Sequence, residues 1–189
     1  KNGHENILVL EDDFNPNESF DFDLLDNILG YDLVFLSRIL QSSHSGVYDM
    51  DWGDPNFVKP GYSYQTQSYV LSKEGVRKLV ETNVDTLKKN IIVSDEFLPA
   101  TYTWHPREDI RNLFYRNMNA YAYRNNIIGQ DRFEAAGNSL TSPIDKSASL
   151  SACFKGSNVA LTMSSTRDSN LARVILMFIC LGPLASAVI

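Results

Sequence analysis

Three consecutive acidic residues, Glu11, Asp12 and Asp13, directly follow an apolar run at residues 6–10. Such runs are typical of strands buried on both faces of a mainly parallel sheet, and ligands of open α/β sheets bind just beyond the carboxyl ends of the strands. Adjacent carboxylates repel one another unless water or a cation separates them, and carboxylate oxygens are ligands that Mg²⁺ and Mn²⁺ prefer. The triplet is therefore either a cation site for a nucleotide diphosphate or a solvated strand end.

The elements that would position this triplet predict an α/β fold. Residues 15–17 contain a proline between two asparagines and predict a turn. Apolar residues then recur at helical spacing over 22–29, with Gly30 as the stop, and residues 32–36 form a second apolar run. A strand, a short helix and a second strand in this order are typical of an α/β sheet.

The middle of the chain predicts a long loop followed by further helices. Residues 41–61 are rich in Ser, Gly, Asp and Pro, and a loop of this length inside a compact domain is often functional. Further strands or extended segments are expected at 57–59, 69–71 and 91–93, and helices after Ser72 and Asp95, each as an N-cap, and over 109–115.

The net negative charge of the chain limits which ligands it is expected to bind. The chain has 189 residues, a net charge of -6 and 43% hydrophobic residues, which fits one globular domain and argues against a nucleic-acid binder. An acidic protein usually holds a diphosphate through a bridging cation. The two cysteines, Cys153 and Cys180, form no disulfide framework.

The chain changes character after residue 144. We expect residues 1–144 to form the catalytic domain, and residues 145–189 to be a Ser-rich linker and apolar tail that is disordered or non-native. The apolar run at 174–183 is shorter than the ~20 residues that a membrane span needs, so membrane association stays open.

Several blocks resemble, in order, glycosyltransferase family 25, the lipopolysaccharide and procollagen glycosyltransferases. They are the Leu-Glu-Asp-Asp-Phe run at 10–14, the tyrosine-rich segment at 60–72, the Gly-Val-Arg-Lys-Leu helix at 75–79, the Val-Ser-Asp-Glu-Phe-Leu-Pro block at 93–99, and Trp-His-Pro at 104–106. The resemblance covers residues 6–107, with a weaker echo to Ser142. The first nucleotide-binding strand of the family has no counterpart here, so we expect a partial domain.

This resemblance implies a GT-A-type fold and an inverting transferase that moves a hexose, most simply galactose, from a UDP-sugar. The acceptor would be a lipopolysaccharide sugar or a hydroxylysine of a collagen-like protein, and the compartment the endoplasmic reticulum lumen or the cytoplasm. The alternative is a catalytically inactive relative that serves as an interaction or adhesion module.

The resemblance also implies a DxD-like donor site. Asp13 would bind Mn²⁺ or Mg²⁺ directly, with Asp12 near the metal or the ribose, and Glu11 would orient its neighbours while contacting the donor. Tyr62 and Tyr64 would form a sugar-facing wall of this site.

By the same resemblance, Asp95 or Glu96 would be the general base that deprotonates the acceptor hydroxyl. Asp95 is equally suited to cap a helix, and the residues do not decide between the two acids. His105 would contact the metal or the pyrophosphate, or would be a packing residue beside Trp104.

Overall fold

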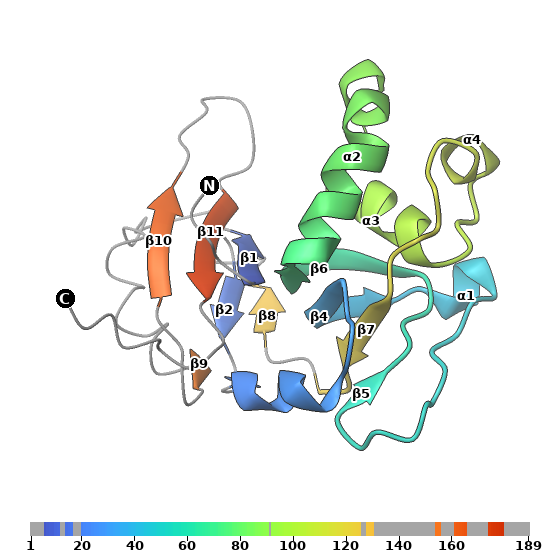
Figure 1. The fold of residues 1–189 in the computed structure, drawn as a ribbon. Coiled ribbons are helices and arrows are strands. Elements are labelled where there is room, and N and C mark those ends of the chain that lie inside the picture. The colour runs from blue at the N-terminus through green and yellow to red at the C-terminus, as the bar shows by residue number, and fades with distance from the viewer. Residues whose placement is uncertain are drawn as a thin grey trace, which may run out of the picture.

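The computed structural model describes residues 6–11, 14–16, 20–90, 92–125, 128–130, 154–155, 161–165 and 174–179. Its main element is a seven-stranded sheet of order β10-β11-β1-β6-β4-β7-β5 (Figure 1). The strands of this sheet are β1 (Asn6–Glu11), β4 (Leu33–Leu40), β5 (Phe57–Val58), β6 (Ser63–Ser72), β7 (Ala120–Tyr123), β10 (Leu161–Ser165) and β11 (Val174–Ile179). Two short ladders pair β2 (Phe14–Pro16) with β8 (Ile128–Gln130) and β3 (Phe20–Asp21) with β9 (Phe154–Lys155).

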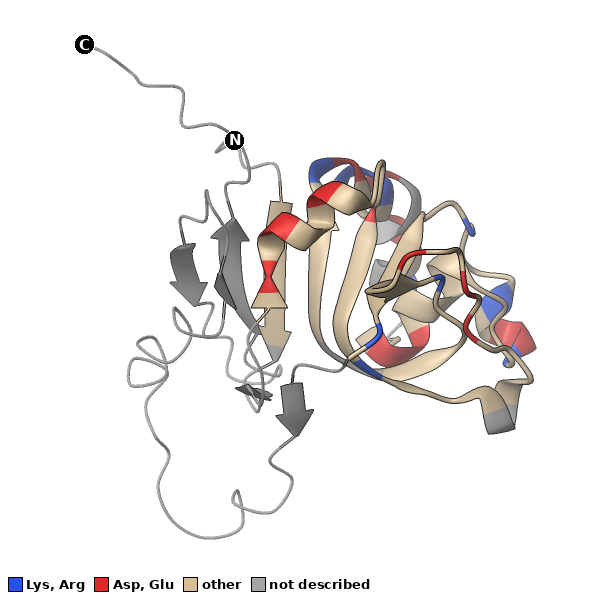
Figure 2. Cartoon of the chain, turned by 90° about the horizontal axis from the view of Figure 1, so that it is seen from below, with Lys and Arg blue, Asp and Glu red and all other residues tan. Residues whose placement is uncertain are grey.

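Helices cover both faces of this sheet. They are a 3-10 helix (Phe22–Asn27), α1 (Ser42–Ser45), α2 (Lys73–Lys89), α3 (Ser94–Tyr102) and α4 (Glu108–Arg111). The 3-10 helix lies on one side of the sheet, and α2 and α3 lie on the other (Figure 1). The 3-10 helix carries acidic residues and no basic one, as Figure 2 shows. A mixed α/β architecture is therefore confirmed.

The direction of the strands differs from the prediction. The β4–β7 pair is parallel, whereas β1–β6, β4–β6, β1–β11, β10–β11 and β5–β7 are antiparallel. The prediction of a mainly parallel sheet is wrong, because a strand covered on both faces gives the same unbroken apolar run whichever way its neighbours point. Since β1 and β4 are both antiparallel to β6, their carboxyl ends point to the side of the sheet at which β6 begins.

The core explains the apolar runs. Leu8 and Leu10 of β1 belong to a cluster on the side of the 3-10 helix, together with Phe20 and Phe22. Val9 of β1 belongs to a second cluster on the other face, to which α3 contributes Phe97 and Leu98. Both sides of β1 and β4 are thus covered, as the sequence predicted.

Helix α2 is fixed against the start of β4 by close packing and an ion pair. Ser72 is its N-cap, as predicted, and its side chain accepts a hydrogen bond from the Gly75 amide at 3.0 Å. A Cβ at Gly75 would lie 2.0 Å from the carbonyl oxygen of Asp32, so no other residue fits this approach. The buried Asp32 carboxylate also pairs with Lys78 Nζ at 2.6 Å. The block at residues 75–79 is therefore structural here.

Four local predictions are wrong. Residues 15–16 lie in strand β2 rather than in a turn. The helical stretch predicted at 22–29 is a shorter 3-10 helix, and α4 is one turn rather than a helix over 109–115. Helix α3 begins at Ser94 with Val93 as its N-cap, so Asp95 is not the cap and instead lies in the first turn.

Described segments of residues 145–189 form strands rather than a linker. The segment Val174–Ile179 pairs with β1 along its whole length, and Leu161–Ser165 pairs with Val174–Ile179. Phe154–Lys155 is strand β9, and the remaining residues of this region, including both cysteines, lie outside the described residues. The boundary at 144/145 stays a prediction. Among the residues that the structure describes, no helix is long and apolar enough to cross a membrane.

Candidate functional site

The acidic triplet begins at the end of β1. Glu11 is the last residue of this strand and pairs with Val174 of β11. Asp12 and Asp13 lie outside the described residues, and so does the side chain of Glu11. The structure therefore places the first member of the triplet at the carboxyl end of a strand, and the metal- and donor-binding roles stay predictions.

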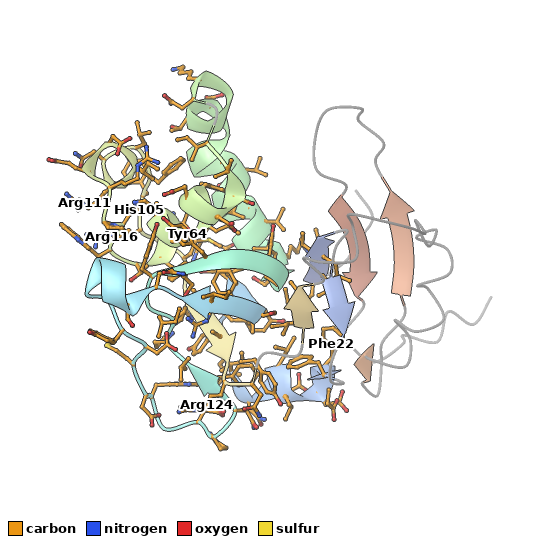
Figure 3. The ribbon with its side chains drawn as sticks, turned by 180° about the vertical axis from the view of Figure 1, so that it is seen from behind. Phe22, Tyr64, His105, Arg111, Arg116 and Arg124 are labelled. Atoms are coloured by element: carbon orange, nitrogen blue, oxygen red, sulfur yellow. The ribbon has the colours of Figure 1, made fainter. Side chains whose placement is uncertain are left out.

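The carboxylate of Glu96, in α3, contacts four polar side chains near the start of β6. Glu96 Oε2 lies 2.8 Å from His105 Nε2 and 3.5 Å from the Tyr62 hydroxyl. Glu96 Oε1 lies 3.3 Å from the Tyr64 hydroxyl and 3.6 Å from Arg107 Nη1. The Glu96 side chain is 16% exposed, so solvent still reaches it. We call these five residues the Glu96 centre; Figure 3 shows Tyr64 and His105 on the side of α3.

His105 is fully buried beside this carboxylate. Its Nδ1 lies 3.2 Å from the Arg107 amide nitrogen and 3.3 Å from the Arg107 carbonyl oxygen, and its Nε2 faces Glu96. Nε2 and Oε2 lie 2.8 Å apart, a close polar contact that does not meet the geometry of a regular hydrogen bond. Burial lowers the pKa of His105, and the negative charge of Glu96 offsets this only in part. A neutral imidazole therefore holds one oxygen of Glu96.

The two tyrosines reach Glu96 from the start of β6. Tyr62 is 1% exposed, and its ring packs edge-on against Tyr64 and His105, with centroids 5.1 Å and 4.9 Å away. Burial, with the nearby Tyr64 and Glu96, raises the pKa of Tyr62, so its hydroxyl stays a donor. The sugar-facing role predicted for both tyrosines stays a prediction. Their shared contact with Glu96 was not foreseen.

A buried network behind the tyrosines fixes their segment. Arg38 donates to the Ser63 hydroxyl at 2.7 Å and pairs with Asp49 at 2.5 Å. Asp49 in turn accepts a hydrogen bond from the Gly61 amide at 2.8 Å. A Cβ on Gly61 would come within 2.6 Å of the Val47 carbonyl oxygen, which requires glycine there. Sequence reasoning missed Arg38 and Asp49, since nothing in the local pattern marks an arginine as buried.

The ladder between β4 and β6 is irregular beside this network. Its register shifts between Phe35 and Ser37 and again between Ser37 and Ile39, after which Ile39 pairs with Tyr64. Bulges re-aim side chains and are frequent next to functional sites. On the other side of β6, Leu10 pairs with Ser68, which is four residues from Tyr64, or about 13 Å along the strand. The carboxyl end of β1 and the Glu96 centre therefore lie on the same side of the sheet, the side at which β6 begins.

The described residues do not form a metal site by themselves. Among them, no three His, Cys, Asp or Glu side chains are grouped so that they could hold a metal ion. Both ring nitrogens of His105 already face other groups, namely the Arg107 amide and Glu96. A metal would therefore depend on Asp12 and Asp13, and the predicted contact of His105 with it stays a prediction.

Comparison with known proteins gives the family. The chain is 30% identical over 191 residues to a glycosyltransferase 25 family member of Aedes aegypti, an alignment that covers 89% of this chain and 30% of that protein. It is 33% identical over 129 residues to procollagen galactosyltransferase 2 of Homo sapiens, covering 62% of this chain and 20% of that protein. The chain is a homologue of glycosyltransferase family 25. The family resemblance read from the sequence is therefore confirmed.

Not every relative of this family 25 homologue is named as an enzyme. A protein of Bos taurus named probable inactive glycosyltransferase 25 family member 3 is 33% identical over 131 residues, covering 65% of this chain and 21% of that protein. The chain spans less than a third of the length of these curated relatives. No family model matches it. No solved structure matches it either.

Proposed function

We propose that this chain forms part of an inverting, GT-A-type hexosyltransferase and that Glu96 is its general base. The Glu96 centre carries the proposal, because it places an accessible carboxylate among hydrogen-bond donors at the edge where β1 ends. Glycosyltransferase relatives at 30–36% identity support the class of reaction. Asp95, which lies in the first turn of α3 next to Glu96, stays the alternative base.

Glu96 can accept a proton without losing its position. The contact with His105 is short, whereas those with Tyr62, Tyr64 and Arg107 measure 3.3–3.6 Å and are weak. An acceptor hydroxyl can therefore replace one of the long contacts. The hydroxyl gives its proton to Glu96, its oxygen bonds to the anomeric carbon, and the sugar–phosphate bond breaks, with the electron pair leaving on UDP.

The donor half of the site is assigned to the end of β1. In this proposal Asp13, with Asp12, holds Mn²⁺ or Mg²⁺, and Glu11 orients these neighbours. The cation supplies charge neutralisation at the diphosphate as UDP leaves. Galactose is the sugar we propose, and a hydroxylysine of a collagen-like protein is the acceptor, because a relative is named procollagen galactosyltransferase 2.

The test compares Glu96→Gln with Asp95→Asn in the full-length protein. Galactose transfer from UDP-galactose to a hydroxylysine peptide is measured with Mn²⁺ present, and UDP binding is measured by calorimetry. We expect Glu96→Gln to lower kcat by about 10²–10⁴-fold with UDP affinity unchanged, and Asp95→Asn to keep most activity. Transfer that survives Glu96→Gln would exclude Glu96 as the base, and a selective loss in Asp95→Asn would move the role to Asp95.

A second candidate is a non-catalytic relative of the family, which is supported by names such as probable inactive glycosyltransferase 25 family member 3. Calorimetry separates the two candidates. Metal-dependent UDP binding that is lost in Asp13→Ala supports the transferase. No UDP binding in either protein would instead support an interaction module.

A further inference from the structure

Arginines of this acidic protein are mostly neutralised by carboxylates. Within the described part of the chain, four of them form such pairs: Arg38 with Asp49, Arg77 with Glu74 and Glu81, Arg107 with Asp109, and Arg124 with Asp51. Arg111 and Arg116 are different. Neither forms an ion pair with a described residue, and both instead lie against one aromatic ring.

That ring is Trp104, which is 47% exposed. The guanidinium carbon of Arg111 lies 3.8 Å from the Trp104 ring centroid, and that of Arg116 lies 5.6 Å away. Leu113 and Tyr115 of the same segment are 37% and 71% exposed. We call Trp104, Arg111 and Arg116 the Trp104 surface; Arg111 and Arg116 are labelled beside His105 in Figure 3.

The composition of this surface fits a protein partner. Tryptophan, tyrosine and arginine dominate the residues that carry binding energy in protein interfaces. Arg111 and Arg116 have no ion-pair partner among the described residues, so an anionic group of a partner would complement them. Arg111 uses a donor on the His105 carbonyl at 2.9 Å, and a guanidinium has five N–H donors, so others remain for a carboxylate.

The surface is joined to the Glu96 centre through the backbone. Trp104 directly precedes His105, whose imidazole faces Glu96, and Arg111 holds the carbonyl of His105. A segment bound on Trp104 would therefore lie beside the residue assigned to deprotonate the acceptor.

We propose that the Trp104 surface binds an acidic segment of the polypeptide acceptor, with Arg111 and Arg116 pairing with its Asp or Glu side chains. The placement beside an acceptor hydroxyl rests on the proposed function. Binding of an acidic peptide does not require the transfer reaction, so the two ideas can fail separately.

The experiment measures peptide binding through Trp104 itself. The chain has two tryptophans, so Trp52→Phe leaves Trp104 as the sole reporter. In this background a capped hexaglutamate, a capped hexalysine and a sulfated hexasaccharide are titrated at low and high salt while tryptophan emission is followed. The double variant Arg111→Gln/Arg116→Gln tests the surface. Arg124→Gln, which removes an exposed arginine already paired with Asp51, is the matched control.

We expect hexaglutamate to change Trp104 emission saturably and salt-dependently, with affinity about tenfold weaker or more in the double variant and unchanged in Arg124→Gln. Equal hexaglutamate affinity in the double variant, or equal binding of hexalysine, would overturn the proposal. Binding of the sulfated hexasaccharide alone would also overturn it and assign the surface to an anionic glycan. Glu96→Gln is expected to bind hexaglutamate normally, so a failure of the transferase proposal leaves this result intact.

Discussion

Replacing His105 with phenylalanine tests the polar role of this side chain. The phenyl ring is larger than the imidazole and must fit a fully buried position, where it can still pack edge-on against Tyr62. The substitution removes the 2.8 Å contact with Glu96 and the acceptor for the Arg107 amide. The cost therefore combines the lost polar contacts with crowding by the larger ring.

The size of the loss follows from these two contacts. A hydrogen bond to a charged group contributes about 1.5–3 kcal/mol, and the His105–Glu96 contact should contribute less because it is not a regular hydrogen bond. A buried group left unsatisfied, here the Arg107 amide, costs about 1–3 kcal/mol. Glu96 is 16% exposed and water can partly replace the imidazole, so we expect a total near the lower end, about 2 kcal/mol. For a domain of this size that lowers Tm by about 4–8 °C.

The pH dependence gives a sharper signature. Because burial lowers the pKa of His105 below its ordinary 6.5, the unfolded chain binds a proton at a higher pH than the folded protein does. The contribution of His105 to the free energy of unfolding is therefore fully present above pH 6.5. It falls as the pH drops towards the folded-state pKa, by at most ~1.4 kcal/mol per pH unit. His105→Phe lacks this contribution, so its stability should change less over the same interval.

Urea denaturation of wild type, His105→Phe and Tyr62→Phe from pH 7.5 to 5.5 measures both effects. Tyr62→Phe removes the hydroxyl that contacts Glu96 at 3.5 Å and hydrogen-bonds with Tyr64, leaves His105 in place, and should keep the pH dependence of the wild type. Parallel stability curves for wild type and His105→Phe would refute the assignment of His105 as a buried neutral imidazole. Equal stability at pH 7.5 would refute the estimate of its contacts with Glu96 and Arg107.

Two further substitutions test the packing of α2 by urea denaturation. Gly75→Ala puts a Cβ 2.0 Å from the Asp32 carbonyl oxygen and should cost about 3 kcal/mol, whereas Val80→Ala, at a 54% exposed position of the same helix, should stay within ~0.5 kcal/mol. Asp32→Asn leaves Lys78 without its 2.6 Å carboxylate and should cost about 3 kcal/mol, against under ~1 kcal/mol for Glu81→Gln in an exposed pair. Costs at Gly75 or Asp32 as small as those of their controls would contradict the observed packing.

Local patterns in the sequence were sufficient where neighbours along the chain decide the structure. The strand at Asn6–Glu11, the strand at Leu33–Leu40 and the cap at Ser72 followed from apolar runs and one hydroxyl. The direction of the sheet did not, because pairing of β1 with β6 joins residues some sixty positions apart and leaves no trace in either run. The strand at Val174–Ile179 was missed because its pairing with β1 joins residues more than 160 positions apart, and Leu161–Ser165 was missed although its partner strand is local.

The sequence predicted which residues would belong to the candidate site, but not how their side chains contact one another. Glu96, His105, Tyr62 and Tyr64 were each named, and the structure brings all four together. Their mutual contacts could not be read from the sequence, because the tyrosines are 34 and 32 positions from Glu96. Arg107 was missed, although it lies only two residues after His105 and contacts the same Glu96 carboxylate.

The antiparallel direction of β6 brings the proposed donor-binding and acceptor-binding residues to the same side of the sheet. Strand β6 is ten residues long, or roughly 33 Å, and it begins beside Tyr62 and Tyr64. Were β6 parallel to β1, as the sequence predicted, its first residues would lie at the opposite edge from Glu11. Because β6 is antiparallel, its start lies at the edge where β1 ends, and α3 brings Glu96 to the same tyrosines. The part of the chain that would deprotonate an acceptor therefore depends on the long-range pairing of β1 with β6, and substitutions that weaken this ladder should reduce transfer even where they touch none of the site residues.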